Sequence, residues 1–216
     1  MPTYEKINTL YKRQMEGANK GKIIEGDYSK EEFTMIDQWE VTEKIDGTNI
    51  RIEFVPWDLE GSFSVPHFAG RTDKAIIPEP LKTNLAKHFE AIDITEVFDF
   101  SKADSITLYC EGFGVGIQKG GKYISDNQDF ILYDILIDGI WLEREKVKEF
   151  AEQLNIEMVP CFGIMSTEEI VELVKAETTS SFGDFPFEGV VCRSKPLLLD
   201  RMGRRVVWKL KIIDFK

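Results

Sequence analysis

Short runs rich in Ile, Val, Phe and Tyr recur along the chain and predict the strands of a β-sheet. The predicted strands cover residues 40–45, 49–55, 105–110, 130–137, 189–193 and 205–212. Charged residues interrupt these runs, as Asp134 does within 130–137, so none is long enough to span a bilayer. We therefore expect a strand-rich protein that makes no use of a membrane.

Other stretches repeat their apolar residues three or four positions apart, which predicts helices that each bury one face. These stretches are 80–92, 143–154 and 167–176, and Ile7, Leu10 and Tyr11 predict one more short helix near the start. Strand pairs and helices interleave without the regular alternation of a doubly wound parallel sheet. The pattern indicates an α+β fold of antiparallel sheets with packed helices.

The size and composition of the chain fit one globular domain over residues 1–216. Its 216 residues are 43% hydrophobic and 30% charged, which excludes disorder and collagen-like repeats. No linker, internal repeat or secretory signal is visible, and three scattered cysteines do not form a disulfide framework. These features predict a cytoplasmic protein.

Two features of the composition limit the chemistry. The only histidines, His67 and His88, lie far apart and without Cys pairs, which disfavours a zinc site or a Ser-His-Asp triad. Chemistry would then depend on Lys, Arg, Asp and Glu. The formal net charge of -11 argues against nucleic acid, yet residues 193–216 contain eight basic and two acidic residues. That segment could offer phosphates a local site, or it could be a basic edge strand protected against aggregation.

The first chemical motif is Lys44 at the end of a predicted strand, followed by the turn residues Asp46 and Gly47. A lysine on such a rigid corner can act as a nucleophile if its amine loses its proton. An ordinary hairpin with a solvated lysine would have the same short pattern. The motif alone therefore carries little weight.

Five further segments follow the Lys44 motif in a fixed order, and together the six resemble the covalent nucleotidyltransferases. That superfamily contains ATP-dependent ligases and mRNA capping enzymes. The segments are Gly-Arg-Thr at 70–72, Tyr-Cys-Glu-Gly-Phe-Gly at 109–114, Phe-Ile-Leu-Tyr-Asp-Ile at 130–135, Phe-Glu-Gly-Val-Val at 187–191 and Trp-Lys-Leu-Lys at 208–211.

Two details of the sequence favour one branch of this superfamily. Asn49 stands where DNA ligases and capping enzymes usually have Arg, and Gly-Ile-Gln-Lys occurs at 116–119. Both are similar to nick-sealing RNA ligases of the phage and RNA-editing type. The resemblance implies an ATP-grasp-like ligase adenylation domain, with two antiparallel sheets flanked by helices and a nucleotide groove between them. Only five residues follow the last motif, so we expect no C-terminal accessory domain.

The resemblance also assigns a role to each motif residue. Lys44 would be the nucleophile that attacks ATP, and Lys209 and Lys211 would contact the α-phosphate and favour the neutral amine on Lys44. Glu188 would hold Mg²⁺, or Mn²⁺, together with substrate phosphates. The remaining candidates would bind nucleotide or RNA: Glu43 next to the nucleophile, Asn49 and Arg71 at the ribose or the RNA 5′-phosphate, Glu111 at the ribose and Tyr133 stacked on adenine.

The implied activity is ATP-dependent joining of RNA ends through lysyl-AMP and adenylated RNA, as in RNA repair. The expected substrates are ATP and the ends of nicked or duplex RNA, and a partner protein would replace the missing C-terminal domain. We expect a phage-like source and, if the source is viral, the host cytoplasm as the location. Three alternatives stay open. They are a capping-type guanylyltransferase that uses GTP, a small DNA ligase, and a noncatalytic module that binds nucleotides or RNA ends.

Overall fold

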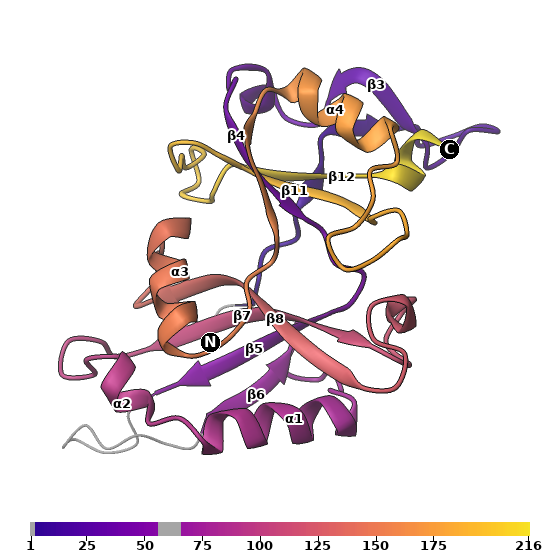
Figure 1. Cartoon of the computed structure of the whole chain (residues 1–216). Helices are drawn as coiled ribbons and strands as arrows, with labels where there is room; N and C mark the ends of the chain where they lie inside the picture. Colours follow the sequence, from indigo (N-terminus) through magenta and orange to yellow (C-terminus); the bar gives the residue numbers. More distant parts are fainter. Residues whose placement is uncertain (1–2, 56–65) are drawn as a thin grey trace. The chain divides into compact units, whose positions relative to one another are not determined.

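The computed structural model describes residues 3–55 and 66–216, and the chain forms two compact units (Figure 1). Unit 1 consists of Met1–Tyr4 and Asp46–Val159, and unit 2 consists of Glu5–Ile45 and Pro160–Lys216. Each unit has its own sheet and its own cluster of buried apolar side chains. The boundary at Ile45 divides the Lys44 motif between them.

Unit 1 is built on an antiparallel sheet with the strand order β6-β5-β7-β8-β9. Three α-helices and a short 3₁₀ turn complete the part of the unit that the structure describes. The strands are β5 (Thr48–Phe54), β6 (His67–Gly70), β7 (Ile106–Gly114), β8 (Gln128–Ile137) and β9 (Ile140–Trp141); the helices are α1 (Glu79–Glu90), α2 (Ile94–Val97) and α3 (Arg144–Gln153), with the turn η2 at Gly120–Lys122.

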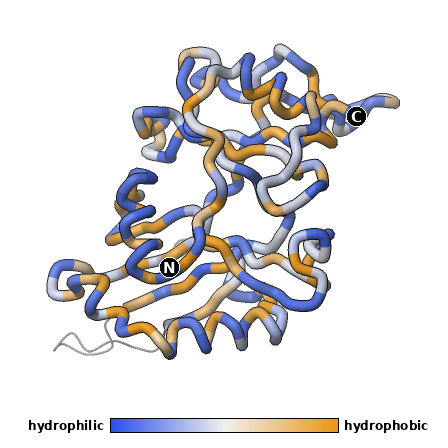
Figure 2. The backbone as a smooth tube through the Cα atoms, viewed as in Figure 1, coloured by the Kyte–Doolittle hydropathy of each residue, from blue (hydrophilic) through white to orange (hydrophobic). Residues whose placement is uncertain are grey.

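Helix α1 shows how the pattern of unit 1 becomes a core. Leu81, Leu85 and Phe89 recur every four residues, so they share one face of the helix, and all three are buried against the sheet. Burial of each such side chain stabilises the fold by about 2 kcal/mol. Hydrophobic positions follow the strands and the inner face of this helix in Figure 2.

Unit 2 contains a second sheet with the order β1-β12-β11-β4-β10 and a separate hairpin. Only the pairing of β1 with β12 is parallel. The strands are β1 (Asn8–Thr9), β4 (Trp39–Glu43), β10 (Cys161–Met165), β11 (Gly189–Ser194) and β12 (Val207–Lys211); the hairpin pairs β2 (Tyr11–Arg13) with β3 (Ile23–Tyr28), and α4 (Thr167–Lys175), η1 (Glu31–Thr34) and η3 (Ile212–Phe215) complete the unit.

Helix α4 covers the apolar face of this second sheet. Its first residue follows a capping box in which Ser166 accepts from the backbone N–H of Glu169 and the Glu169 carboxylate accepts from the Ser166 N–H. Ile170 and Val174 then lie on the buried face of the helix, in the same cluster as Trp208. Unit 2 therefore has a core independent of unit 1.

The predicted α+β class of antiparallel sheets and helices is confirmed, and each strand and helix expected beyond residue 40 is present within a few residues. The short helix expected around Ile7, Leu10 and Tyr11 is wrong. The segment is extended, and the Leu10 backbone N–H donates to the carbonyl of Lys209 at 3.1 Å. Three apolar positions are too few to define a helical period, and the edge of β12 offers backbone groups to an extended segment.

No helix within residues 3–55 and 66–216 has both the length and the apolar character needed to cross a bilayer.

Candidate functional site

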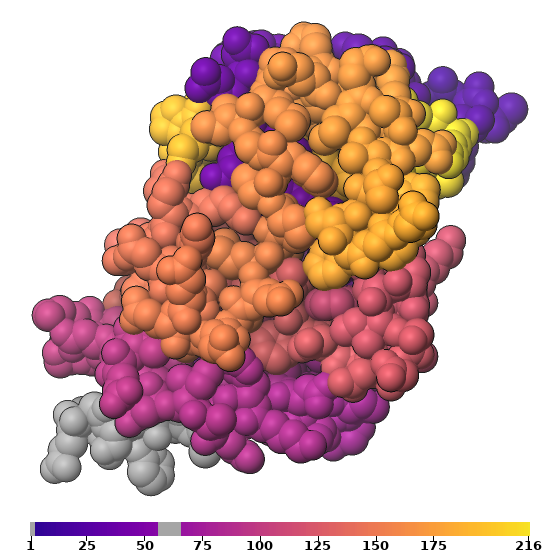
Figure 3. Space-filling view, viewed as in Figure 1, coloured from indigo at the N-terminus to yellow at the C-terminus, as the bar shows by residue number. Residues whose placement is uncertain are grey.

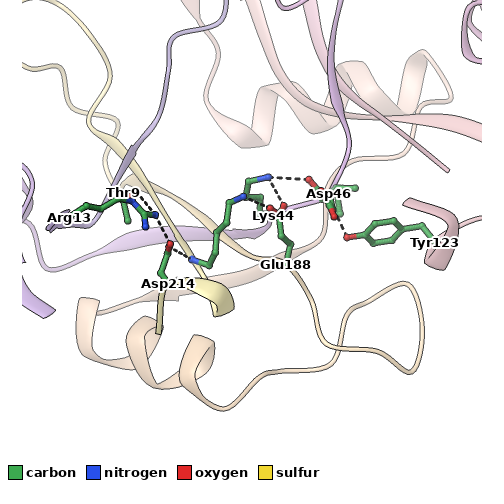
Figure 4. Close-up of polar contacts among 9 residues, drawn as sticks. Thr9, Arg13, Lys44, Asp46, Tyr123, Glu188 and Asp214 are labelled. Carbon is green, nitrogen blue, oxygen red and sulfur yellow. Dashed lines mark hydrogen bonds and ion pairs between the residues drawn. The ribbon is translucent and has the colours of Figure 1, made fainter. Parts of the chain in front are cut away.

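The Lys44 side chain projects from the end of β4 toward the start of β11. Its backbone N–H donates to the carbonyl of Gly189 at 2.9 Å, which fixes the position from which the side chain leaves the sheet. The Lys44 Nζ lies 2.5 Å from the Glu188 Oε2 and 3.2 Å from the carbonyl of Ile45 (Figure 4). The Lys44 side chain is one-fifth exposed, and its amine is held at a carboxylate.

Glu188 joins two lysines from different strands. Its other carboxylate oxygen, Oε1, is ion-paired with the Nζ of Lys211, at the end of β12. Sheet pairing explains the meeting, because Lys211 lies opposite Gly189, the residue after Glu188. Unit 2 therefore contains a chain of amine, carboxylate and amine at Lys44, Glu188 and Lys211.

Trp208 and Leu210 alternate with Lys209 and Lys211 along β12, and both are buried in the core. Lys209 and Lys211 therefore lie together on the opposite face of the strand. Burial lowers the pKa of Lys209, and the positive charges of Lys44 and Lys211 lower it further. Unit 2 thus brings together four of the residues selected from the sequence, with three cations around one carboxylate.

Glu43 precedes Lys44 but its side chain has other partners. Glu43 is 2% exposed, and its carboxylate accepts from the Ser180 hydroxyl at 2.5 Å and from the Ser181 backbone N–H at 2.9 Å. Successive side chains of a strand point to opposite faces, so Glu43 and Lys44 diverge. Glu43 anchors the segment that leads into Glu188.

Three further candidates meet within unit 1. Asn49 and Glu111 lie opposite each other on β5 and β7, and the Asn49 Nδ2 donates to the Tyr133 hydroxyl. Burial raises the pKa of Tyr133 well above its ordinary value, helped by nearby Tyr4 and Glu111. A Cβ at Gly47 would stand 2.3 Å from the carbonyl of Gly112, so only glycine allows β5 to begin this close to β7.

Arg71 is exposed and follows β6 directly, at the end of the sheet where β5 begins. A residue that the sequence did not single out supports its turn. Arg51 is fully buried; its Nε donates to the carbonyl of Gly70 at 2.9 Å, and its guanidinium is ion-paired with Asp73 and with Glu53. The sequence signal for this role is one arginine between the alternating apolar residues Ile50 and Ile52 of a predicted strand.

The candidate site offers a divalent cation one carboxylate, that of Glu188. Among the described residues, no three His, Cys, Asp or Glu side chains gather closely enough to hold a metal ion by themselves. Glu188 supplies one carboxylate whose charge two lysines already share. One carboxylate fits Mg²⁺ or Mn²⁺ when phosphates and water supply the other ligands.

The chemistry available in unit 2 is phosphate chemistry. Lys44 offers an amine on a rigid strand end, and Lys209 and Lys211 offer positive charge beside it. Fixed positive charge next to a nucleophile stabilises the negative charge that a phosphoryl group carries in its transition state.

Known proteins share this fold. Structures of Naegleria gruberi RNA ligase match the chain: one with PPi has 18% identity, a TM-score of 0.59 and coverage of 83% of this chain and 50% of its own. A lysine-to-alanine variant with ATP and Mn has 16% identity, a TM-score of 0.61 and coverage of 85% and 52%. A glutamate-to-alanine variant with AMP and Mn has 16% identity, a TM-score of 0.61 and coverage of 86% and 53%. This chain spans about half the length of those proteins.

The family assignment comes from a different comparison. No curated protein matches the chain. The family model described as RNA ligase matches residues 37–211, which include all six motifs from Lys44 to Lys211. The chain therefore belongs to the RNA ligase family.

Proposed function

We propose that the protein is an ATP-dependent RNA ligase that joins a 3′-hydroxyl to a 5′-phosphate through lysyl-AMP and an adenylated RNA end. The observation that carries the proposal is the group in unit 2. An amine at Lys44, a carboxylate at Glu188 and two further amines at Lys209 and Lys211 converge from three adjacent strands. Outside catalysis, a fold gains little by crowding three cations in a partly buried place.

In the first step, the Lys44 Nζ attacks the α-phosphorus of ATP. An N–P bond forms, the bond from the α-phosphorus to the bridging oxygen breaks, pyrophosphate leaves with the electron pair and the amine gives up a proton. Lys209 and Lys211 stabilise the negative charge that shifts onto the phosphate oxygens. Glu188 holds the Lys44 amine at the strand end before attack, so the nucleophile is already oriented.

A divalent cation bound at Glu188 would neutralise charge on the phosphates. Its site would overlap the contacts that the Glu188 carboxylate makes with Lys44 and Lys211. Binding of such a cation would therefore compete with the Lys44 contact, so that Glu188 would release the amine.

Residues of unit 1 act on the nucleoside and on the RNA end in this proposal. Glu111 accepts a ribose hydroxyl, Tyr133 contacts adenine, and Asn49 and Arg71 bind the ribose or the 5′-phosphate. The buried Asn49 Oδ1 has no hydrogen-bond partner among the described residues, which suits an acceptor that awaits a donor from a ligand. Glu43 supports nucleotide binding by fixing residues 180 and 181.

Separate features support the choice of ATP as the nucleotide and of RNA as the strand. The structures of Naegleria gruberi RNA ligase with ATP and Mn favour ATP over GTP. Asn49 and the Gly-Ile-Gln-Lys run at 116–119 favour RNA over DNA and favour nicked or duplex ends, as in RNA repair by phage-like enzymes. A partner protein could assist binding of free RNA ends.

Covalent labelling tests the first step. The protein is incubated with magnesium and α-labelled ATP or GTP, denatured and examined for retained label. We expect label from ATP in the wild type, and at least a 100-fold loss in Lys44→Ala and in Lys209→Ala. Lys20→Ala, on an exposed turn of unit 2, should label normally.

The same experiment separates the alternatives. Label from GTP alone selects a capping-type guanylyltransferase. If the wild type retains no label from either nucleotide, the proposal is contradicted, and the result favours the noncatalytic module that binds nucleotides or RNA ends. Unchanged label in Lys44→Ala would place the nucleophile elsewhere.

Sealing assays then test the strand preference. Nicked RNA, nicked DNA and single-stranded RNA with a 5′-adenylate are compared at equal concentration. We expect the fastest joining with nicked RNA. Equal sealing rates on nicked RNA and nicked DNA would contradict the RNA preference that we infer from Asn49.

A further inference from the structure

The N-terminal segment, to which the sequence motifs give no role, lines a cavity in unit 2. The cavity has a volume of about 530 Å³, within the usual size of a small-molecule site. Its charged lining residues are Lys6, Arg13, Lys22, Lys209, Lys211 and Asp214. In Figure 3, the N-terminal atoms in indigo lie beside the C-terminal atoms in yellow, as the contact between Arg13 and Asp214 requires.

The positive charge in this cavity is only partly compensated. Arg13 is ion-paired with Asp214 at 2.5 Å, and Lys211 is ion-paired with Glu188. Lys6, Lys22 and Lys209 form no ion pair with any residue that the structure describes. Five cations and one carboxylate therefore surround a space that a small anion can enter.

The surroundings of Lys209 indicate that this cavity binds an anion. Its side chain is partly buried and lies near the charges of Lys44 and Lys211, and both effects lower the pKa of the Lys209 amine. A bound polyanion would reverse that effect, because opposite charge at short range stabilises the ammonium ion. Surface lysines spaced apart in water would need no such partner.

We propose that this cavity binds pyrophosphate, both as the β- and γ-phosphates of ATP and as the leaving group, through Lys6, Lys22 and the Arg13–Asp214 pair together with Lys209 and Lys211. The inference rests on the proposed function. Lys211 lines the cavity and also shares Glu188 with the Lys44 amine, so one side chain links the cavity to the nucleophile.

Pyrophosphate fits this lining better than a single phosphate of an RNA backbone. It concentrates several negative charges on two adjacent phosphoryl groups, and the cavity concentrates positive charge from two ends of the chain. The Arg13 guanidinium keeps its geometry through bonds to Asp214 and to the carbonyl of Gly21 at 2.6 Å. A preformed donor loses less entropy on binding an anion.

The reverse of the first step isolates this site. In pyrophosphorolysis, a pyrophosphate oxygen attacks the phosphorus of lysyl-AMP, a P–O bond forms, the P–N bond breaks and the Lys44 nitrogen takes up a proton. ATP is the product. This reaction depends on bound pyrophosphate, whereas sealing of RNA that already carries a 5′-adenylate does not.

Lysyl-AMP is therefore prepared in the whole protein and discharged with increasing pyrophosphate. We expect the half-saturating pyrophosphate concentration to rise about threefold in Lys22→Ala and about tenfold in the double variant Lys6→Ala, Lys22→Ala. Sealing of preadenylated nicked RNA should change less than twofold. Lys20→Ala is the matched control, since Lys20 lies on the same exposed turn as Lys22 but outside the cavity lining, and should match the wild type in both assays.

Calorimetric titration of the protein with pyrophosphate alone separates a failure of this inference from a failure of the proposed function. If the wild type forms no lysyl-AMP, tenfold weaker binding to the double variant still supports the site. Equal pyrophosphate dependence and equal binding in wild type and double variant would overturn it. Slower sealing of preadenylated RNA with unchanged pyrophosphate dependence would also overturn it and would assign these lysines to the RNA backbone.

Discussion

Individual side chains of the site gain their roles from partners that are distant in the sequence. Glu188 lies 144 positions from Lys44 yet approaches its amine at 2.5 Å, and Arg51 holds a turn that begins 19 positions away. The motif order identifies Lys44 and Glu188 because each sits in a distinctive short sequence. It gives no hint of Arg51 or Ser180, whose importance comes from the group that each one contacts.

The ion pair of Arg51 with Asp73 should depend on pH. The hydrogen bond and charge of the Arg51 guanidinium hold the pKa of the Asp73 carboxyl below its ordinary value. Such a lowered pKa adds stability above the ordinary carboxyl pKa of about 4, and that stability is lost as the pH falls through the lowered value. Asp73→Asn should therefore lower the melting temperature at pH 7, and the difference from wild type should shrink toward zero in acid.

Thermal unfolding between pH 2.5 and pH 7 measures this effect, where about pH 2.5 is the acid limit of ordinary carboxyl titration. Asp37→Asn is the control, because Asp37 is exposed and has no ion-pair partner among the described residues. A difference between Asp73→Asn and wild type that persists unchanged into acid would show that the carboxylate charge is not what stabilises this turn.

The hydroxyl of Ser180 should matter because it satisfies a buried carboxylate. Ser180→Ala removes the shorter of the two hydrogen bonds to Glu43, and a buried charged acceptor that loses a donor costs about 1–3 kcal/mol. We expect a corresponding loss in the free energy of unfolding, measured in urea. Ser181→Ala retains the backbone N–H that serves Glu43 and should leave stability within about 0.5 kcal/mol. Equal effects from the two substitutions would exclude the hydroxyl as the cause.

At the scale of elements, strands and helices beyond residue 40 follow from their hydrophobic patterns, but the N-terminal strands do not. Ile7, Leu10 and Tyr11 have helical spacing in the sequence, whereas β12 and the hairpin determine the conformation of the segment. Tertiary contacts of this kind override a short local pattern. The cationic cavity was unpredictable for the same reason, since its lining depends on β1 lying beside β12.

The pairing of β11 with β12 should require glycine at position 189. Gly189 has φ +153°, and a Cβ there would stand 2.1 Å from the carbonyl oxygen of Leu210. Gly189→Ala should separate the strands where Glu188 meets Lys211, cost roughly 1–3 kcal/mol or more and reduce lysyl-AMP formation at least tenfold.

Gly203→Ala is the matched control for this prediction. Gly203 also has positive φ, at +74°, but a Cβ there would meet nothing within 4 Å. It should show backbone strain without the collision, with normal lysyl-AMP formation. Normal labelling in Gly189→Ala would mean that Glu188 and Lys211 tolerate a shift of the strands that carry them.

For the whole molecule, net charge is a poor guide to the site. The chain carries -11, and the eight basic residues in 193–216 first suggest a free basic surface. In the structure, Arg204, Lys211 and Lys216 are ion-paired with Asp200, Glu188 and Glu177. The cations without ion-pair partners in the cavity come partly from the opposite end of the sequence, so only the fold locates the positive charge.

The two separate cores should make the units respond separately to damage. Leu85 is fully buried in the unit 1 cluster, Ile170 is fully buried in the unit 2 cluster, and the two clusters share no residue. Leu85→Ala and Ile170→Ala should each cost about 2–5 kcal/mol, through lost burial and the cavity that remains. Backbone hydrogen exchange should then increase mainly in β5, β7 and β8 for Leu85→Ala, and mainly in β4, β11 and β12 for Ile170→Ala. If either substitution increases exchange equally in all six strands, the two clusters unfold as one cooperative core, and the stability of the Lys44 site would depend on unit 1 as much as on unit 2.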